Sequence, residues 1–194
     1  MIEGSKIGLR KLHVDDLNVY RQWNQPGQAW QELDGPYYPK RTPAEVEATV
    51  ENLKARIEAD NWPPVPLRLV IAQADSDRMI GLVSRYWISE ETQWAAIGIV
   101  IYDPAHWRHG IGYEALGLWT DYLFEQQPDW VRLDLRTWSG NTGMMRLAEK
   151  LGYTLEARFR KARVVNGQYY DGLGYGVLRE EWQAHFRLGF RTTI

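Results

Sequence analysis

One stretch of the chain decides its fold, and it reads Ile97-Gly-Ile-Val-Ile-Tyr-Asp-Pro-Ala-His-Trp-Arg-His-Gly110-Ile-Gly112-Tyr-Glu-Ala115. It begins as an apolar strand, turns at Asp-Pro, and enters a helix through Gly-x-Gly. Glycines at a helix start let a ligand approach the unpaired backbone N–H groups at the positive end of the helix dipole. The order of strand, glycine loop and helix therefore indicates a site for a phosphate-bearing cofactor.

Two other interpretations of these glycines compete with that one. Gly110-x-Gly112 would also suit a helix start that only needs tight packing. With Ala115 it matches a dinucleotide-binding fingerprint, and Asp134 lies about 20 residues further on, as that fingerprint expects. However, the fingerprint follows its strand directly in a doubly wound parallel sheet, whereas here an Asp-Pro-Ala-His-Trp-Arg-His insert intervenes. No Gly-Lys-Ser/Thr follows the glycines, so a Walker loop is absent.

The segments on both sides alternate between strand and helix patterns. Upstream, we expect a strand at 7–12, helices at 15–23 and 42–59, and strands at 67–73, 79–88 and 94–102. Downstream, we expect a helix at 111–125, a strand at 130–137, a helix at 141–151, and strands at 154–165 and 168–178. The sequence thus predicts an α+β fold, with a mostly antiparallel twisted sheet, one parallel crossover and flanking helices.

The composition is that of a globular domain with an excess of large rings. The 194 residues suit a single domain, 1–194, with a core at 7–182 and a short tail at 183–194. Ten tryptophans bring the aromatic content to 13%, more than a core needs, so some should line a pocket. A net charge of −2 argues against nucleic-acid binding as the main role.

Other absences narrow the function classes. Without cysteine, a disulfide framework, a thiolate metal site and a cysteine nucleophile are excluded. Because no histidine pair has metal-ligand spacing, we expect no metal. No apolar run is long enough to cross a membrane and no targeting segment is evident, so we expect a cytoplasmic protein without membrane contact.

The quoted stretch resembles motif A of the GNAT N-acetyltransferases, and it is most similar to their RimJ/RimL-like branch. The resemblance continues at Asn141 and through Arg146-Leu-Ala-Glu-Lys-Leu-Gly-Tyr153, which are similar to the family's second motif. Leu155-Glu-Ala and the Asn166-Gly167 hairpin resemble its closing strands. The resemblance spans roughly residues 7–182, and it implies a GNAT fold that transfers an acetyl group from acetyl-CoA to a primary amine.

The same resemblance implies which residues contact the cofactor. The segment 107–113 would hold the CoA pyrophosphate by backbone N–H groups, and the strand end at 101–102 would pair with the pantetheine arm. Asn141 would lie near the sulfur. The implied cofactor-binding residues are Ile101, Tyr102, Trp107, Arg108, His109, Gly110, Ile111, Gly112, Tyr113 and Asn141.

The family's usual proton-transfer residues are missing from this sequence. Ala96 stands where many relatives carry a glutamate base, and Met144 and Ala148 stand where others carry a serine or tyrosine acid. Asp34 and Glu90 are the substitutes that we predict for catalysis. Asp34 could instead organise the Asp-Gly-Pro turn, and Glu90 could belong to a solvated turn.

Aromatic and acidic side chains suggest the acceptor side of the site. The predicted substrate-binding residues are Trp30, Glu32, Tyr37, Tyr86 and Trp87, with Asp171 as a further acidic candidate. Rings and carboxylates together favour a cationic amine. Successive strand residues face opposite ways, so at most one of Tyr86 and Trp87 should line the pocket.

The sequence does not decide which acceptor the protein uses or whether it catalyses the transfer. The RimJ/RimL resemblance implies a protein N-terminus, whereas Arg163-Val-Val-Asn-Gly-Gln-Tyr-Tyr-Asp resembles spermidine N-acetyltransferases and favours a small amine such as a polyamine or aminoglycoside. The missing acid and base motivate an alternative, a non-catalytic acyl-CoA-binding or regulatory module. A homodimer is compatible with either.

Overall fold

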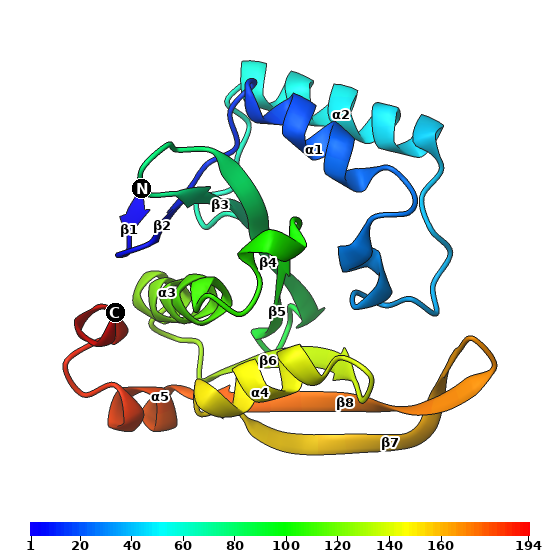
Figure 1. Ribbon diagram of the computed structural model, residues 1–194. Helices are drawn as coiled ribbons and strands as arrows, with labels where there is room; N and C mark the ends of the chain where they lie inside the picture. The colour runs from blue at the N-terminus through cyan, green and yellow to red at the C-terminus, as the bar shows by residue number, and fades with distance from the viewer.

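Eight strands form a single sheet through the molecule (Figure 1). The computed structural model describes all residues 1–194. The strands are β1 (Ile2–Glu3), β2 (Ile7–Arg10), β3 (Arg68–Gln73), β4 (Met79–Ser89), β5 (Trp94–Ile101), β6 (Arg132–Trp138), β7 (Thr154–Val165) and β8 (Gln168–Leu178). The helices are α1 (Asp16–Asn24), α2 (Pro43–Glu58), α3 (Ile111–Gln126), α4 (Thr142–Lys150) and α5 (Arg179–His185). Three short 3-10 helices are η1 (Ala29–Glu32), η2 (Pro104–His106) and η3 (Phe190–Thr193).

The sheet topology confirms the fold class expected from the sequence. The strands lie in the order β1-β2-β3-β4-β5-β6-β8-β7, and only β5 and β6 are parallel. Helix α3 makes the crossover between these two strands. The β7–β8 hairpin turns at Asn166 and Gly167, whose φ angles of 50° and 75° are those that a two-residue hairpin loop requires.

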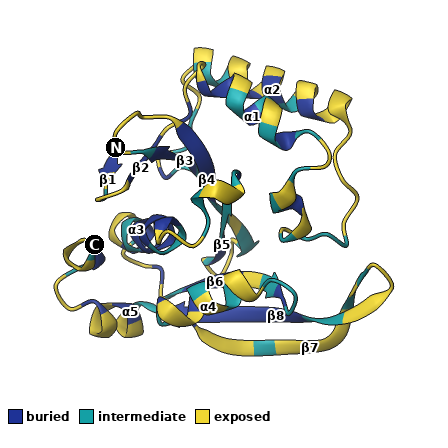
Figure 2. Ribbon diagram, viewed as in Figure 1, coloured by how far each residue is buried: buried dark blue, intermediate teal, exposed yellow.

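Hydrophobic residues pack on both faces of the sheet. Strand β3 shows why: Leu69 and Ile71 belong to the larger cluster under α3, while the alternating Val70 and Ala72 belong to a smaller one under α1 and α2. Figure 2 shows α3 and β8 as largely buried and β7 as largely exposed. None of the helices combines the length and the apolar character that a membrane-spanning segment needs.

The main core extends beyond the range predicted from the sequence. Ile2 and the tail residues Phe186 and Phe190 belong to the larger cluster. Gly117 of α3 makes room for the tail, because a Cβ there would lie 2.1 Å from the Phe190 ring. The C-terminal residues therefore contribute to the packing of the domain.

The parallel pair β5–β6 is short, and its shortness creates an opening in the sheet. Pairing covers only residues 95–97 of β5 and 133–135 of β6, although β5 stays paired with β4 as far as Ile101. The Tyr102 N–H donates to the Ile80 carbonyl at 3.0 Å. Because antiparallel pairs alternate, the backbone groups of Ile99 and Ile101 face away from β4, towards the opening.

Candidate active site

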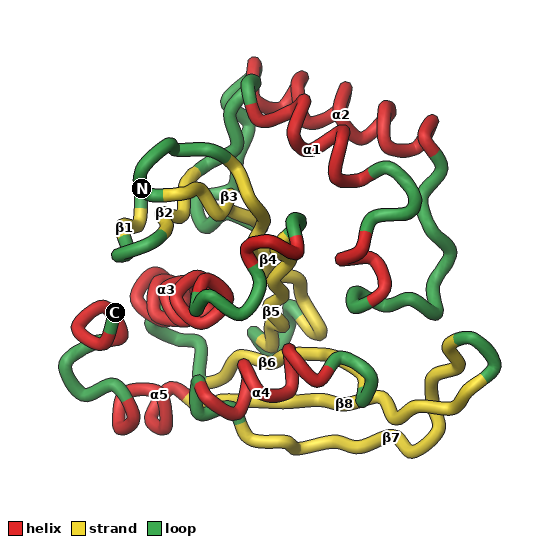
Figure 3. Tube along the Cα trace, viewed as in Figure 1, coloured by secondary structure: helices red, strands yellow, loops and turns green.

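The opening between β5 and β6 leads into a cleft with a volume of about 1110 Å³. Its walls come from β5, the start of α3, helix α4, the loop 33–41 and the β7–β8 hairpin. Figure 3 shows the long loop between η1 and α2 on the same side of the molecule as the hairpin tip. The cleft has two ends, which we call the α3 end and the hairpin end.

The α3 end is built around an uncapped helix N-terminus. Gly110 is the N-cap in the left-handed conformation (φ 83°), and it has no side chain to cap the helix. The first N–H bonded within this turn is that of Glu114, which donates to the Gly110 carbonyl at 3.1 Å. The N–H groups of residues 111–113 therefore remain as donors at the positive end of a helix dipole.

Close packing and basic side chains complete the α3 end. A Cβ on Gly112 would lie 3.4 Å from Leu147 of α4 and 3.6 Å from Ile101 of β5, so these three elements meet at this glycine. Arg108, Arg146 and Lys150 line the same end, and the Lys150 ammonium lies 4.4 Å from the centroid of the Tyr113 ring. N–H donors with three cations suit phosphate groups.

A buried carboxylate, which sequence reasoning missed, anchors the start of α3. Glu114 is 2% exposed and accepts hydrogen bonds from the backbone N–H groups of Lys6 and Ile7 and from the Ser5 hydroxyl, at 2.8–3.2 Å. Lys6 in turn donates to the carbonyl of His109 at 2.9 Å. The turn between β1 and β2 thereby fixes the glycine loop, and the His109 side chain does not line the cleft.

Trp107 and Tyr102 are placed differently from each other. The Trp107 indole lines the cleft and donates to the Ile101 carbonyl at 2.9 Å, so that carbonyl already has a partner. The nearest unpaired N–H and C=O groups of this strand edge are those of Ile99. Tyr102 is only 1% exposed; it stacks on Trp23 and accepts from the Asn24 amide at 3.3 Å.

Two predicted cofactor-binding residues keep their side chains out of the cleft. Burial raises the pKa of the Tyr102 hydroxyl, which lies in the smaller hydrophobic cluster. The Tyr102 N–H is bonded to Ile80 of β4 and so faces away from the opening. Ile111 is a core residue at 8% exposure, so only its backbone N–H faces the site, which is the contact expected from the sequence.

Asn141 joins the two ends of the cleft. Its Oδ1 caps α4 by accepting from the Met144 N–H at 3.0 Å, and its Nδ2 donates to the Leu33 carbonyl at 3.1 Å. The Trp138 indole donates to the same carbonyl at 2.9 Å. Gly140 permits this position of the ring, since a Cβ there would lie 1.9 Å from it. The loop 33–41 is thus held across the cleft at Leu33.

Asp34 follows Leu33 directly and is the only carboxylate that lines the cleft. Its side chain makes no hydrogen bond, so it does not organise the Asp-Gly-Pro turn. Although the side chain is accessible to solvent, the surrounding walls raise the pKa of its carboxyl, and the charges of Lys40 and Arg41 oppose that rise. The structure thus leaves a free carboxylate at the hairpin end.

Tyr86 faces the hairpin end from β4. It pairs directly with Ala96 of β5, so the side chains of Tyr86 and Ala96 lie on the same face of the sheet. The cleft walls raise the pKa of the hydroxyl although the residue is 47% exposed, and Arg136 opposes that rise. The hydroxyl is therefore protonated at neutral pH. Trp30 and Tyr37 line the same end.

Several other predicted residues lie outside the cleft. Glu90 lies in the exposed turn between β4 and β5, and the exposed Glu32 side chain points away from the lining. Trp87 faces the opposite side from Tyr86 and packs on Trp130, with the ring centroids 5.0 Å apart. Asp171 accepts from the Lys161 N–H at 2.9 Å and pairs with Arg158 at 3.6 Å, so it supports the β7–β8 hairpin. Strand alternation and turn exposure explain these corrections.

The hairpin end is also lined by basic side chains that we did not predict from the sequence. Lys40, Arg41, Arg136 and Arg163 line it, and they come from three segments far apart in the chain. No local pattern brings such residues together, because only the folded sheet does so. The nearby Asp134 is 2% exposed and paired with Arg132 and Arg136 at 2.6 and 3.1 Å. Both carboxylate oxygens of Asp134 are paired with arginines, so Asp134 is not free to bind a dinucleotide.

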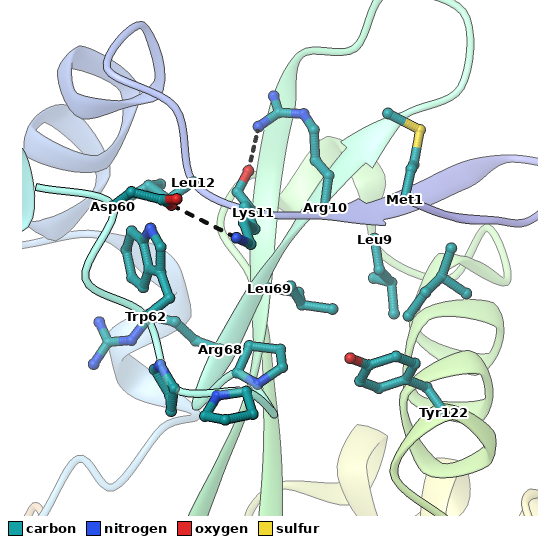
Figure 4. A pocket seen from close by; sticks show the side chains of 14 residues that line it. Met1, Leu9, Arg10, Lys11, Leu12, Asp60, Trp62, Arg68, Leu69 and Tyr122 are labelled. Atoms are coloured by element: carbon teal, nitrogen blue, oxygen red, sulfur yellow. Dashed lines mark hydrogen bonds and ion pairs between the residues drawn. The ribbon is translucent and has the colours of Figure 1, made fainter. Parts of the chain in front are cut away.

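A second, smaller hollow of about 410 Å³ lies elsewhere, between β2 and the proline-rich segment before β3 (Figure 4). Leu9, Trp62 and Tyr122 line it, and Lys11 lies 3.7 Å from Asp60 at its margin. No predicted site residue lines this hollow. No group of three or more histidine or acidic side chains is arranged to hold a metal ion.

Comparisons with known proteins agree with this geometry. Residues 6–154 match the model of the acetyltransferase (GNAT) domain. The SPbeta prophage-derived uncharacterized N-acetyltransferase YokL of Bacillus subtilis (strain 168) is 21% identical over 180 residues, which cover 93% of this chain and 94% of that protein.

Solved structures show the same fold. Spermidine N-acetyltransferase from Vibrio cholerae, solved with CoA and spermine, superposes with a TM-score of 0.72 at 22% identity, covering 92% of this chain and 99% of that one. RimL, the ribosomal L7/L12 alpha-N-protein acetyltransferase, superposes with a TM-score of 0.67 at 19% identity, covering 90% of this chain and 95% of that one. The chain belongs to the GNAT acetyltransferase family and is an acetyl-CoA-dependent N-acetyltransferase.

Proposed function

We propose that this cleft transfers the acetyl group of acetyl-CoA to a primary amine held between the loop 33–41 and the β7–β8 hairpin. One observation carries the proposal: a single cleft joins an uncapped helix N-terminus to a free carboxylate, Asp34. The first feature suits a nucleotide diphosphate, and the second suits the deprotonation of an ammonium group.

The residues of the α3 end fit CoA. The N–H groups of 111–113 would hold its pyrophosphate, with Arg108, Arg146 and Lys150 supplying positive charge. The free edge of β5 at Ile99 would hydrogen-bond the pantetheine arm as an added strand. Bound there, acetyl-CoA supplies an acetyl thioester that is already activated towards an amine.

Two residues of the hairpin end would act as the general base and the general acid of the reaction. Asp34 accepts a proton from the acceptor ammonium, directly or through one water, which frees the lone pair that forms the new N–C bond. Tyr86 then donates its proton to the departing thiolate as the C–S bond breaks, and its phenolate takes up, directly or through one water, the second proton that the nitrogen loses on becoming an amide. The pKa of Tyr86 is raised, so the hydroxyl carries its proton at neutral pH. These roles replace the residues missing at Ala96, Met144 and Ala148.

The class of acceptor is supported only by likeness to relatives. The RimJ/RimL resemblance supports a protein N-terminus, and the similarity to a spermidine N-acetyltransferase supports a small amine. Both acceptors fit the reaction above. The cytoplasmic location and the homodimer stay predictions.

Thiol release from acetyl-CoA, measured with a panel of amines and peptides, tests the proposal. We expect turnover with at least one amine and tight binding of CoA in a separate titration. Binding of CoA without turnover on any amine would instead support the non-catalytic acyl-CoA-binding module, which the missing family acid and base motivate.

A further inference from the structure

The charges at the hairpin end do not balance. Asp34 is the only acidic side chain that lines the cleft, against four cations at this end: Lys40, Arg41, Arg136 and Arg163. Arg136 is paired with Asp134 at 3.1 Å. The ion pairs of the structure include no carboxylate within 4.0 Å of Lys40, Arg41 or Arg163. Three cations thus have no close ion-pair partner where the acceptor would bind.

Arg163 is the most constrained of the three. Its guanidinium lies over the rings of Tyr37 and Tyr38, 4.5 and 5.9 Å from their centroids. Its Nε is buried and has no hydrogen-bond partner. Buried donors are normally paired, and Arg163, which lines the cleft, has neither a hydrogen-bonded acceptor for this atom nor a carboxylate partner within the protein. The planar fork of arginine matches a carboxylate or a phosphate.

The other two cations have only neutral partners. Arg41 donates to the Tyr20 hydroxyl at 3.2 Å, and the Lys40 ammonium donates to the Gln31 carbonyl. Both belong to the same loop as Asp34, and their charges act on its carboxyl. Tyr37 follows three residues after Asp34 and carries Arg163 on its ring. A ligand whose amine meets Asp34 therefore brings its neighbouring atoms close to these cations.

We propose that the acceptor amine carries an anionic group, a carboxylate or a phosphate, and that Arg163 binds this group with help from Arg41 and Lys40. This inference rests on the proposed function, because it assigns the acceptor of the same site. It replaces the cationic acceptor expected from the sequence: Glu32 and Asp171 do not line the cleft, so the carboxylates that would hold a polyamine are absent from it.

The phosphates of CoA do not account for these cations. The α3 end has its own set in Arg108, Arg146 and Lys150, on the glycine loop and on α4. The hairpin-end cations lie beyond the Leu33 carbonyl, which Asn141 and Trp138 hold across the cleft. A polyamine bound at Asp34 would place its remaining ammonium groups among like charges, which disfavours binding.

Matched acceptor pairs test the proposal on the intact protein. The pairs are alanine and alaninamide, an amino sugar phosphate and the free amino sugar, and an N-terminal Ala-Asp tetrapeptide and its Ala-Asn counterpart, with spermidine as the polycation. We expect the anionic member of at least one pair to have a kcat/KM about tenfold higher, since hydrogen bonds to charged groups are the strong ones. The pair that responds identifies the source of the anion.

Arg163→Gln should reduce that preference to near unity and leave the Kd for CoA unchanged. Arg160→Gln is the matched control, because Arg160 is an exposed residue of the same strand and lies outside the cleft. A preference for the neutral members or for spermidine in the wild-type protein, or a preference that Arg163→Gln leaves intact, would overturn the inference while the proposed function stands. No turnover on any amine would contradict both.

Discussion

The two ends of the cleft differ in whether backbone groups or side chains form them. The α3 end is built mainly from backbone N–H groups, two glycines and a helix dipole within one continuous stretch of sequence, to which α4 adds Arg146 and Lys150. The hairpin end consists of side chains from the loop 33–41, β4, β6 and β7, which only the folded sheet brings together. One end therefore depends on chain geometry, and the other depends on side-chain identity.

This difference indicates which part of the site can change its residues without loss of cofactor binding. Backbone donors bind the same phosphates whatever the neighbouring side chains, which is why Trp107 is compatible with the α3 end. At the hairpin end a single substitution alters charge or proton transfer, so acceptor specificity can change there without loss of cofactor binding. The link between the ends is the Leu33 carbonyl, held by Asn141 and Trp138.

The largest expected effect is at the α3 end. Gly112→Val should weaken CoA binding by about 100-fold, because the branched side chain occupies the space beside the N–H donors and removes charge-assisted hydrogen bonds worth ~3 kcal/mol. A CoA titration measures this, with Gly112→Ala as a milder comparison, since its Cβ would make only close van der Waals contacts with Leu147 and Ile101. An unchanged Kd in the folded valine variant would show that the cofactor lies elsewhere.

At the hairpin end, Asp34→Asn should lower kcat by about 100-fold, the usual contribution of a general base, and leave the Kd for CoA unchanged. The raised pKa of Asp34 means that wild-type activity should fall with decreasing pH already above the ordinary aspartate range, because the base must be ionised. The variant should lack this acidic limb. Glu32→Gln, an exposed neighbour outside the cleft, is the control. Retention of the limb in Asp34→Asn would exclude Asp34 as the base.

A smaller effect is expected where the two ends meet. Trp138→Phe removes one of the two donors to the Leu33 carbonyl and keeps the ring, so the loop 33–41 should loosen by about 1 kcal/mol. We expect the KM of the acceptor to rise about fivefold, with little change in CoA affinity. Initial rates at saturating acetyl-CoA measure this change. Equal losses in acceptor and CoA binding would contradict the separation of the two ends.

The smallest effect should come from the discarded base candidate. Glu90 lies in an exposed turn away from the cleft, so Glu90→Gln should leave kcat/KM within about twofold of the wild type. The same assay that reports on Asp34 measures it. A loss as large as that of Asp34→Asn would mean that the hairpin end has been assigned to the wrong face of β4.

The strand, loop and helix that form the α3 end could be predicted from the sequence because the rules that specify them are local. Strand, Asp-Pro, Gly-x-Gly and helix lie in order along the chain, and the one parallel crossover follows from them. The burial of the Tyr102 and Ile111 side chains could not be predicted, because chain proximity to the glycine loop does not tell which way a side chain points. Glu114 was missed because its partners, Ser5 to Ile7, lie at the other end of the chain.

The hairpin end could be predicted only in part. Asp34, Trp30, Tyr37 and Tyr86 do line it, since they follow from the loop and strand expected to overhang the site. Arg163 and Arg136 could not be placed, because their strands meet through the pairing of β6, β8 and β7, which no local pattern specifies. From the sequence we therefore expected carboxylates at this end to bind a cationic amine, whereas four cations and a single carboxylate line it.

A crystal structure of the protein with CoA would show whether the cofactor and Asp34 share one cleft. We expect the pyrophosphate within hydrogen-bonding distance of the N–H groups of 111–113, the pantetheine arm along Ile99, and the sulfur in the same cleft as the Asp34 carboxylate. CoA bound in the smaller hollow beside Trp62, or with its sulfur directed away from Asp34, would contradict this placement.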